Sequence, residues 1–373
     1  MHIADATMFY APRSGGVRSY LSAKHQWLRQ HTGHRHSLVV PGGRLDVEGD
    51  LYHIPAPPLP FGHGYRFPLR AAGWAACLAG IGPDLIEAGD PYVPAWGALE
   101  AGERLGIPVI AFYHSDVTRL ISTRVGAWSA RLVGRYVRNL YSRFDRVLAP
   151  SRVIAGRLEA LGLGNVRHQP LGVDLERFAP ERADPGLRAR LGLDPDTRLL
   201  IFVGRYAREK NIPQLARTME ILGPRYHLLL VGPDMPSRPV ANSTVESDYL
   251  DHEKISRMLA SADAFVHPGD RETFGLVVLE AMASGLPVVG VDSGAVPELI
   301  LPGTGVLAPS PAPPELAEAV RTLFSMDAPA MAARARRTAE TRWSWDAAFR
   351  RMLGTYAELT AGEPQRRLQH GPD

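Results

Sequence analysis

The chain has 373 residues, of which 45% are hydrophobic and 22% are charged. These values are typical of a folded protein and exclude a disordered or collagen-like chain. The length exceeds what one hydrophobic core usually organises, so we expect two domains. No apolar stretch approaches the roughly 20 residues that cross a bilayer, and the single Cys77 permits neither an internal disulfide nor a zinc cluster of cysteines. With an N-terminus unlike a secretion signal, these features predict a cytoplasmic protein.

The net charge of +3 conceals an uneven distribution. Residues 1–170 hold 19 of the 42 basic residues and 12 of the 39 acidic ones, so the rest of the chain holds 23 basic and 27 acidic residues. A positive first half favours an anionic partner, and a membrane surface, a nucleic acid and an anionic substrate all fit.

Short apolar strands alternate with helical patterns along the whole chain. In the first half, after a strand at 2–10 and a helix at 17–31, the pattern predicts further strands at 37–41, 84–87, 108–113 and 146–149. In the second half it predicts strands at 198–203, 227–231, 264–267 and 287–291. Strands separated by helices form parallel sheets, so the sequence predicts an α/β fold of two doubly wound, Rossmann-like units. Glycine and proline residues at 169–180 mark the join between them.

Ligands of such sheets bind beyond the carboxyl ends of the strands, so the loops there are the candidate sites. After the first strand, Gly15 and Gly16 allow the backbone to approach a ligand and leave amides for a phosphate at a helix start. A tight turn would use the same glycines, and the loop lacks the GxGxxG pattern of dinucleotide-binding proteins. After the strand at 198–203, Arg205 and Lys210 suit a diphosphate leaving group, although such charges are also common on solvated surfaces.

The segment 267–287 carries the most specific pattern. Glu272 lies in a loop that follows a strand, and Glu280 lies in the second turn of the next helix. The spacing suggests one carboxylate for a sugar and one for the hydroxyls of a ribose, whereas an amphipathic helix with incidental acids is the alternative. The backbone amides at the positive start of that helix suit phosphate oxygens; they belong to Phe274, Gly275 and Leu276.

Four motifs together resemble those of GT-B-fold retaining glycosyltransferases of family 4 (group 1). They are Glu272-x-Phe-Gly-x4-Glu280, Val203-Gly-Arg205 followed by Glu209-Lys210, Gly172-Val-Asp174, and Gly15-Gly16. The resemblance covers nearly the whole chain. It implies an acceptor-binding domain at 1–168, a nucleotide-sugar-binding domain at 169–342 facing it across a cleft, and a helix at 343–373 that returns to the first domain before a frayed tail.

The resemblance also implies roles for single residues. Arg205 and Lys210 would bind the diphosphate, with help from Gly15, Gly16 and the amides of Phe274, Gly275 and Leu276. Glu280 would hold the ribose, Glu272 would contact the donor sugar, and His114 would lie beside that sugar, although a histidine at a strand end is often structural. In such enzymes the leaving phosphate takes the acceptor proton, so His114 is not assigned as the general base. They need no metal or other cofactor, and Asp194-Pro-Asp196 is interpreted as a turn and not as a metal-binding pair.

Residues 119–144 form one long helical pattern with a basic face. That face consists of Arg124, Trp128, Arg131, Arg135 and Arg138, and the apolar side consists of Val125, Leu132, Val133, Tyr136, Val137, Leu140 and Phe144. Arginines beside a tryptophan suit an anionic lipid surface, and a solvated face on a core helix is equally consistent. Peripheral binding to the inner face of the cytoplasmic membrane is therefore a hypothesis.

The first half contains a looser resemblance that bears on the substrates. The stretches 9–18, 40–42 and 64–66 resemble GDP-mannose-dependent phosphatidylinositol mannosyltransferases. We therefore expect transfer of a hexose from a nucleotide sugar, GDP-mannose by preference, to a lipid or glycan hydroxyl, such as that of a phosphatidylinositol or diacylglycerol. The alternatives are a UDP-sugar-dependent transferase of glycolipid, capsule or lipopolysaccharide synthesis, and an inactive glycan- or nucleotide-binding relative. A nucleic-acid partner is not expected, because no nucleic-acid-binding motif accompanies the basic face.

Overall fold

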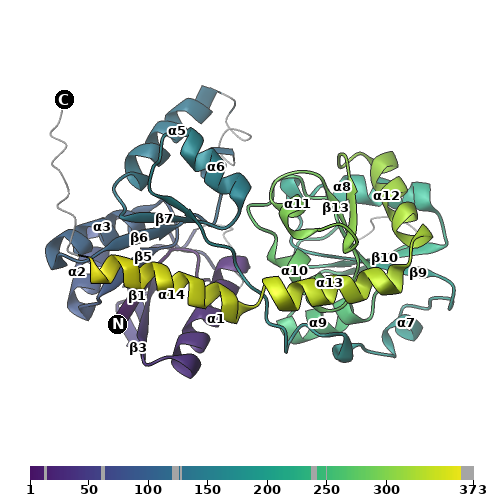
Figure 1. Ribbon diagram of the computed structural model, residues 1–373, viewed down its shortest axis with the longest axis horizontal. Helices are drawn as coiled ribbons and strands as arrows, with labels where there is room; N and C mark the ends of the chain where they lie inside the picture. The colour runs from purple at the N-terminus through teal and green to yellow at the C-terminus, as the bar shows by residue number, and fades with distance from the viewer. Residues whose placement is uncertain are drawn as a thin grey trace. The chain divides into compact units, whose positions relative to one another are not determined.

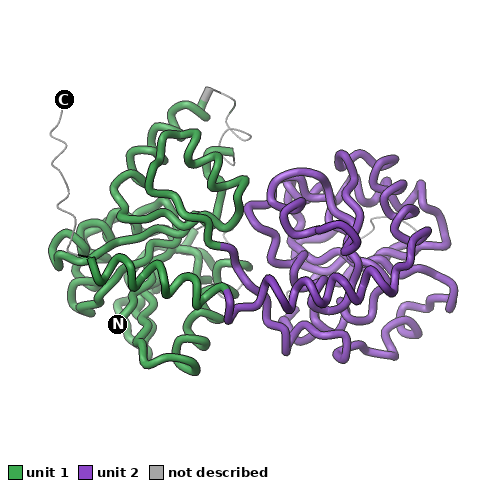
Figure 2. The backbone as a smooth tube through the Cα atoms, in the orientation of Figure 1, with its two compact units in different colours: residues 1–169, 348–373 green, residues 170–347 purple. Residues whose placement is uncertain are grey.

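The computed structural model describes residues 1–11, 15–59, 64–119, 126, 128–236, 242–248 and 250–362. The chain forms two compact units, residues 1–169 with 348–373 and residues 170–347 (Figures 1 and 2). Both are built on a largely parallel sheet between helices, which confirms the expected α/β fold of two doubly wound units. No helix of the described residues combines the length and apolar character that a bilayer crossing requires.

Unit 1 contains an eight-stranded sheet in the order β3-β4-β2-β1-β5-β6-β7-β8. Its strands are β1 (His2–Ala6), β2 (Arg35–Gly42), β3 (Asp46–Glu48), β4 (Leu51–Pro55), β5 (Leu85–Ala88), β6 (Val109–Phe112), β7 (Arg146–Ala149) and β8 (Val166–His168). All neighbours are parallel except β3, which runs antiparallel to β4. The central β1 pairs Ile3 with Leu85 of β5, and His2 with Arg35 of β2.

Helices cover both faces of this sheet because alternate strand residues point to opposite sides. The helices are α1 (Gly16–His31), α2 (Ala71–Ile81), α3 (Val93–Leu105), α5 (Trp128–Tyr141), α6 (Arg152–Ala160) and most of α14 (Trp345–Ala361). Ala4 and Ala6 belong to the apolar core with Trp74 of α2 and Leu140 of α5. Asp5 faces the other side, where α1 and α14 pack.

A buried cluster of charges joins α1 and α14 to the sheet. The ammonium of Lys24 lies 2.8 Å from Asp5 Oδ1 and 3.2 Å from Glu87 Oε1, and these three side chains are at most 2% exposed. Tyr20 donates to Glu87 Oε1 at 2.9 Å, and Tyr356 of α14 donates to Glu87 Oε2. Removing one partner of such a cluster leaves an uncompensated buried charge, so we infer that it holds α14 firmly on unit 1.

Unit 2 contains a six-stranded, wholly parallel sheet in the order β11-β10-β9-β12-β13-β14. Its strands are β9 (Arg198–Val203), β10 (Tyr226–Val231), β11 (Ser243–Glu246), β12 (Ala264–His267), β13 (Val288–Val291) and β14 (Gly305–Ala308). Its helices are η1 (Pro180–Arg182), α7 (Leu187–Arg190), η2 (Arg208–Lys210), α8 (Ile212–Leu222), α9 (His252–Ala260), α10 (Leu276–Ala283), α11 (Val296–Leu299), α12 (Pro313–Ser325) and α13 (Ala328–Arg342). The core on one face joins Leu215 of α8 and Val320 of α12 to Phe202 and Val266 of the sheet.

The returning C-terminal helix is confirmed, and it begins two residues later than expected. Residues 345–347 of α14 belong to unit 2, and the helix lies on unit 1 from Ala348 onward (Figure 2). Gln169 holds its first turn there, with Nε2 donating to the carbonyl of Ala348 at 2.9 Å. The expected tail after 362 lies outside the described residues.

Candidate functional site

The point where the strand order reverses in unit 2 lies between β9 and β12. From β9 the chain continues to β10 and β11 on one side, and β12 to β14 lie on the other. In open α/β sheets ligands bind beyond the carboxyl ends of the two strands at such a point. Here the loop 204–211 follows β9 and the loop 268–275 follows β12, and these are the loops that carry the sequence motifs.

Three polar side chains meet at this position. Lys210, from the single turn η2, forms an ion pair with Glu272 Oε1. His267, the last residue of β12, places Nε2 3.0 Å from the same oxygen and is fully buried. Lys210 and Glu272 are each 16% exposed, so solvent reaches the pair without surrounding it. The structure therefore brings Lys210 and Glu272, 62 residues apart in sequence, into direct contact.

The electrostatics of this cluster favour an ionised carboxylate. Burial works to raise the pKa of Glu272, but the Lys210 ammonium and the His267 hydrogen bond outweigh it and hold that pKa well below its usual range. Burial also lowers the pKa of His267 despite the opposing effect of Glu272. At neutral pH the cluster thus holds one cation, one anion and a neutral imidazole, and an arriving phosphate would compete with Glu272 for Lys210.

The start of α10 adjoins this cluster, and Phe274 and Gly275 are buried there. Gly275 adopts the left-handed conformation with φ 97°, which glycine adopts without strain. Its amide and those of Phe274 and Leu276 form no hydrogen bond with another described residue. A Cβ at Gly275 would lie 3.9 Å from Glu272 Cγ, so the amides and the carboxylate are neighbours. Unpaired amides at the positive end of a helix favour an anion.

Arg205 makes no contact with the pair of Lys210 and Glu272 among the described residues. Its side chain is 63% exposed and forms an ion pair with Glu209 of its own loop at 2.7 Å. The sequence analysis assigned Arg205 and Lys210 to the binding of a diphosphate. In the structure each forms an ion pair with a glutamate, Arg205 with Glu209 and Lys210 with Glu272. A diphosphate would replace Glu209 as the partner of Arg205, which costs little because an exposed pair contributes little.

Glu280 lies partly buried in the second turn of α10. The charged groups that affect it belong to another segment, residues 174–177. Burial raises its pKa to about 7, the Arg177 guanidinium works to lower it, and the Asp174 carboxylate works to raise it. Asp174 belongs to the Gly172-Val-Asp174 motif, to which the resemblance assigned no role. The structure thus brings Asp174 close enough to Glu280 to affect its ionisation.

If Glu280 holds the ribose of the donor, as the resemblance implies, its raised pKa predicts that donor binding depends on pH. An ionised carboxylate accepts hydrogen bonds from a ribose diol better than a neutral acid does. The acid form gains population as pH falls through about 7, so the Kd for GDP-mannose should rise severalfold between pH 8 and pH 6. Glu280→Gln should bind weakly and independently of pH over that range. Calorimetry on both proteins measures this, and an equal slope in the two would contradict it.

In unit 1, His114 follows β6 and lies among aromatic rings. It stacks on Phe112 with centroids 4.3 Å apart, and its centroid lies 5.1 Å from that of Tyr20. Burial lowers its pKa to about 3; the Asp5 carboxylate works to raise that pKa, and the Lys24 ammonium works to lower it further. The imidazole is therefore neutral at physiological pH. Gly15 and Gly16 lie at the start of α1. Gly15 is exposed, and a Cβ placed on it would have no atom within 4 Å, so this helix start is accessible.

The expected basic face is found in part on α5. Arg131, Arg135 and Arg138 are exposed and form no ion pair with another described residue. Arg124 and the side chain of Trp128 lie outside the described residues. Two residues of the expected apolar side are exposed: Leu132 is 56% exposed and Tyr136 is 40% exposed. On α5, Val137 and Leu140 are buried, whereas Leu132 is exposed beside the arginines.

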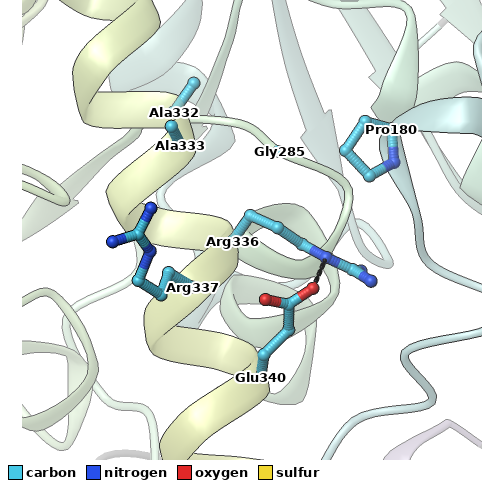
Figure 3. A pocket seen from close by; sticks show the side chains of 7 residues that line it. All are labelled: Pro180, Gly285, Ala332, Ala333, Arg336, Arg337 and Glu340. Carbon is cyan, nitrogen blue, oxygen red and sulfur yellow. Dashed lines mark hydrogen bonds and ion pairs between the residues drawn. The ribbon is translucent and has the colours of Figure 1, made fainter.

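A surface hollow of about 380 Å³ in unit 2 contains none of the motif residues. It is lined by Pro180, Gly285, Ala332, Ala333, Arg336, Arg337 and Glu340 (Figure 3). The Arg336 guanidinium is already engaged there, since it donates to the carbonyls of Phe178 at 2.7 Å and Ala283 at 2.6 Å and to Glu340 at 2.6 Å. We interpret this hollow as part of the contact between the end of α10 and α13, because Arg336 of α13 donates there to the carbonyl of Ala283, the last residue of α10.

Two further sequence interpretations can be compared with the structure. Asp194-Pro-Asp196 forms a turn closed by the amide of Thr197 and the carbonyl of Asp194 at 3.0 Å, as expected. His267 received no role from the sequence, although it is the third member of the Lys210 cluster. Its position could have indicated a role, because it is the last residue of a buried strand and directly precedes the loop that contains Glu272.

Two family models match the chain. "Glycosyltransferase Family 4" matches residues 14–177, and "Glycosyl transferases group 1" matches residues 184–342. A GDP-mannose-dependent alpha-mannosyltransferase from Mycobacterium tuberculosis (strain CDC 1551 / Oshkosh) is 32% identical over an alignment of 323 positions, which covers 83% of this chain and 84% of that relative.

Two other similar proteins cover more of the chain. A GDP-mannose-dependent alpha-(1-6)-phosphatidylinositol dimannoside mannosyltransferase from Mycobacterium tuberculosis (strain ATCC 25177 / H37Ra) is 28% identical over an alignment of 381 positions, which covers 96% of this chain and 97% of that relative. The structure of sucrose-phosphate synthase from Thermosynechococcus elongatus has a TM-score of 0.80 at 21% identity and covers 97% of this chain and 100% of its own. At 21% identity, this similarity shows a shared fold only.

Proposed function

Because the chain belongs to the family 4 (group 1) glycosyltransferases and has their GT-B fold, we propose that it transfers mannose from GDP-mannose to a hydroxyl of a membrane lipid. The observation that carries the choice of donor is the 32% identity to a GDP-mannose-dependent relative over most of both chains. The phosphatidylinositol dimannoside mannosyltransferase, which matches nearly the full length, supports a lipid acceptor such as a phosphatidylinositol.

In the proposed reaction the configuration of the sugar is retained and no metal is required. The bond from C1 of the sugar to the diphosphate breaks, the acceptor oxygen bonds to C1 on the same face, and the acceptor proton passes to the departing phosphate. Lys210 and the amides of Gly275 and Leu276 would stabilise the charge that builds on that phosphate. The low pKa of His114 makes its imidazole a weak base, which supports a hydrogen-bonding role.

Nucleotide preference tests this proposal. The protein should bind GDP at least tenfold more tightly than UDP or ADP in calorimetry, and GDP-mannose should be hydrolysed slowly to GDP without an acceptor. NMR of the transferred sugar's anomeric proton would test retention, and activity after treatment with EDTA would test metal independence. A tenfold preference for UDP would instead favour the UDP-sugar-dependent alternative, and the absence of any nucleotide binding would contradict the proposal.

The exposed face of α5 supports a lipid acceptor reached at a membrane surface. Seven of the ten large hydrophobic side chains that are exposed among the described residues belong to unit 1. Two of them, Leu132 and Tyr136, lie on α5 beside Arg131 and Arg135. A helix with apolar side chains between arginines can insert the apolar side chains into the membrane interface, while its arginines pair with anionic headgroups.

We therefore predict that binding to anionic vesicles depends on this face. Each arginine near an anionic surface contributes on the order of 1 kcal/mol, so a variant with Arg131, Arg135 and Arg138 all changed to Gln should bind roughly a hundredfold more weakly. The measurement is co-sedimentation with phosphatidylcholine vesicles that contain 30 mol% or no phosphatidylglycerol. The matched control changes the exposed Arg217, Arg225 and Arg337 of unit 2 to Gln. Equal losses in the two triple variants would show that net charge is responsible, against the proposal.

A further inference from the structure

His267 contacts the carboxylate of Glu272, yet the sequence motifs assign it no role. It is the last residue of β12, it is fully buried, and its Nε2 lies 3.0 Å from Glu272 Oε1. Its ring is nearly parallel to the buried rings of Phe202 on β9 and Phe265 on β12, at interplanar angles of 14° and 18°. The imidazole therefore belongs to the packed core of unit 2, whereas the carboxylate that it contacts belongs to a loop.

The surroundings of the imidazole determine which of its nitrogens carries the proton. Glu272 is ionised, so its Oε1 can only accept a hydrogen bond, and the nitrogen that faces it must donate. That nitrogen is Nε2. Nδ1, which is buried and has no hydrogen-bond partner among the described residues, is then the nitrogen without a proton. Burial disfavours a second proton and lowers the pKa of His267, so the ring is a neutral donor.

The two oxygens of the Glu272 carboxylate have different surroundings. Oε1 accepts from both His267 and Lys210. Oε2 forms no hydrogen bond or ion pair with another described residue, and the side chain is 16% exposed. Because an ionised carboxylate is satisfied only when both oxygens accept, Oε2 is the oxygen that is available to a hydroxyl of a bound ligand.

A bound diphosphate would affect the two partners of Oε1 differently. Lys210 carries a positive charge, and in the proposed reaction it pairs with the diphosphate, which weakens its contact with Glu272. His267 cannot turn to the diphosphate in the same way, because its ring is fully buried at a strand end and carries no charge. His267 is therefore the partner that Glu272 keeps when the donor binds.

The backbone of the Glu272 loop is held independently of the imidazole. Asn211 Nδ2 donates to the carbonyl of Pro268 at 3.0 Å, which ties this loop to the loop after β9. The amide of Ala295 donates to the carbonyl of Glu272 at 3.0 Å, which ties it to the loop after β13. Loss of the His267 donor should therefore free the carboxylate of Glu272 and leave the loop itself in place.

We propose that His267 is a positioning residue for Glu272. Its Nε2–H holds Oε1, so that Oε2 stays directed at hydroxyls of the donor sugar while Lys210 pairs with the diphosphate. Because the donor is neutral, it orients the carboxylate without adding a second cation that would compete with Lys210 for the diphosphate. This role rests on the proposed glycosyl transfer.

Two substitutions at His267 separate its hydrogen bond from its volume. His267→Phe keeps a flat ring beside Phe202 and Phe265 but removes the donor, whereas His267→Gln has an amide nitrogen near the position of Nε2. A lost hydrogen bond to a charged group should lower kcat/KM for GDP-mannose by about tenfold to a hundredfold in His267→Phe. His267→Gln should regain most of this loss. The Kd for GDP should stay close to that of the wild-type protein in both, because GDP has no sugar for Glu272 to contact.

The matched control is His227→Phe, in β10 of the same sheet. His227 Nε2 lies 2.9 Å from Thr244 Oγ1, so this variant also loses a histidine hydrogen bond, but at the end of the sheet opposite the motif loops. It should keep the wild-type kcat/KM. The proposal would be overturned by an unchanged kcat/KM in His267→Phe, by equal impairment of His267→Gln, or by a loss of GDP affinity as large as the loss of kcat/KM.

Nitrogen NMR of the histidine rings in the full chain tests the contact without any sugar. The resonances of His267 are those that are missing from the spectrum of His267→Gln. At neutral pH we expect a proton on Nε2 and none on Nδ1, both before and after the addition of inorganic diphosphate. A proton on Nδ1, a charged ring, or a change of tautomer with diphosphate would contradict the proposed role. Failure to transfer from GDP-mannose would refute the proposed function and would leave this spectrum interpretable.

Discussion

Lys210→Met is expected to lower kcat/KM for GDP-mannose by about a hundredfold, or about 3 kcal/mol of transition-state stabilisation. Methionine keeps most of the length and volume of the lysine but removes the charge that we propose meets the departing diphosphate. The substitution also removes the closest positive partner of Glu272, whose low pKa depends on it. GDP binding should weaken as well, because the same cation faces the product.

Steady-state kinetics and calorimetry measure the two effects. The control is Arg208→Ala, which removes an exposed cation from the same loop that has no ion pair with a described residue. It should retain nearly full activity. If Lys210→Met and Arg208→Ala behaved alike, the positive charge of the loop as a whole would be responsible, and the specific role of Lys210 would be wrong.

Glu272→Gln should also abolish most transfer, but with the opposite effect on GDP. A carboxylate that accepts hydrogen bonds from hydroxyls of the donor sugar contributes about 1.5–3 kcal/mol, so kcat/KM should fall between tenfold and a hundredfold. GDP carries no sugar to contact Glu272. In the variant, Lys210 is freed from its carboxylate partner, so GDP should bind as tightly as to the wild-type protein or more tightly.

Calorimetry with GDP and with GDP-mannose separates these effects. Glu318→Gln, which neutralises an exposed carboxylate on α12, is the control and should change neither affinity. Weaker GDP binding in Glu272→Gln would show that the carboxylate supports the phosphate site through the position of Lys210. In that case the proposed contact with the sugar would lose its support.

Several strands could be predicted because their signal is local. The strands β7, β9 and β12 have the bounds that their apolar runs predict, since a central strand of a covered parallel sheet is buried on both faces. The motif loops follow from the same reasoning, because each lies at a strand end. The short edge strands β3, β8, β11 and β14 were missed. Each of them has only three or four residues and so gives little local signal, and β4, which is not at an edge, was missed as well.

Contacts between distant segments could not be predicted in this way. Nothing in the helical pattern of α1 indicates that Lys24 is fully buried, because Glu87 and Tyr356, which surround it with Asp5, lie 63 and 332 residues away. The pairing of Lys210 with Glu272 has the same origin. Local periodicity reports the environment of a residue along its own element, whereas the charge and ring that face it come from elements that only the folded chain brings together.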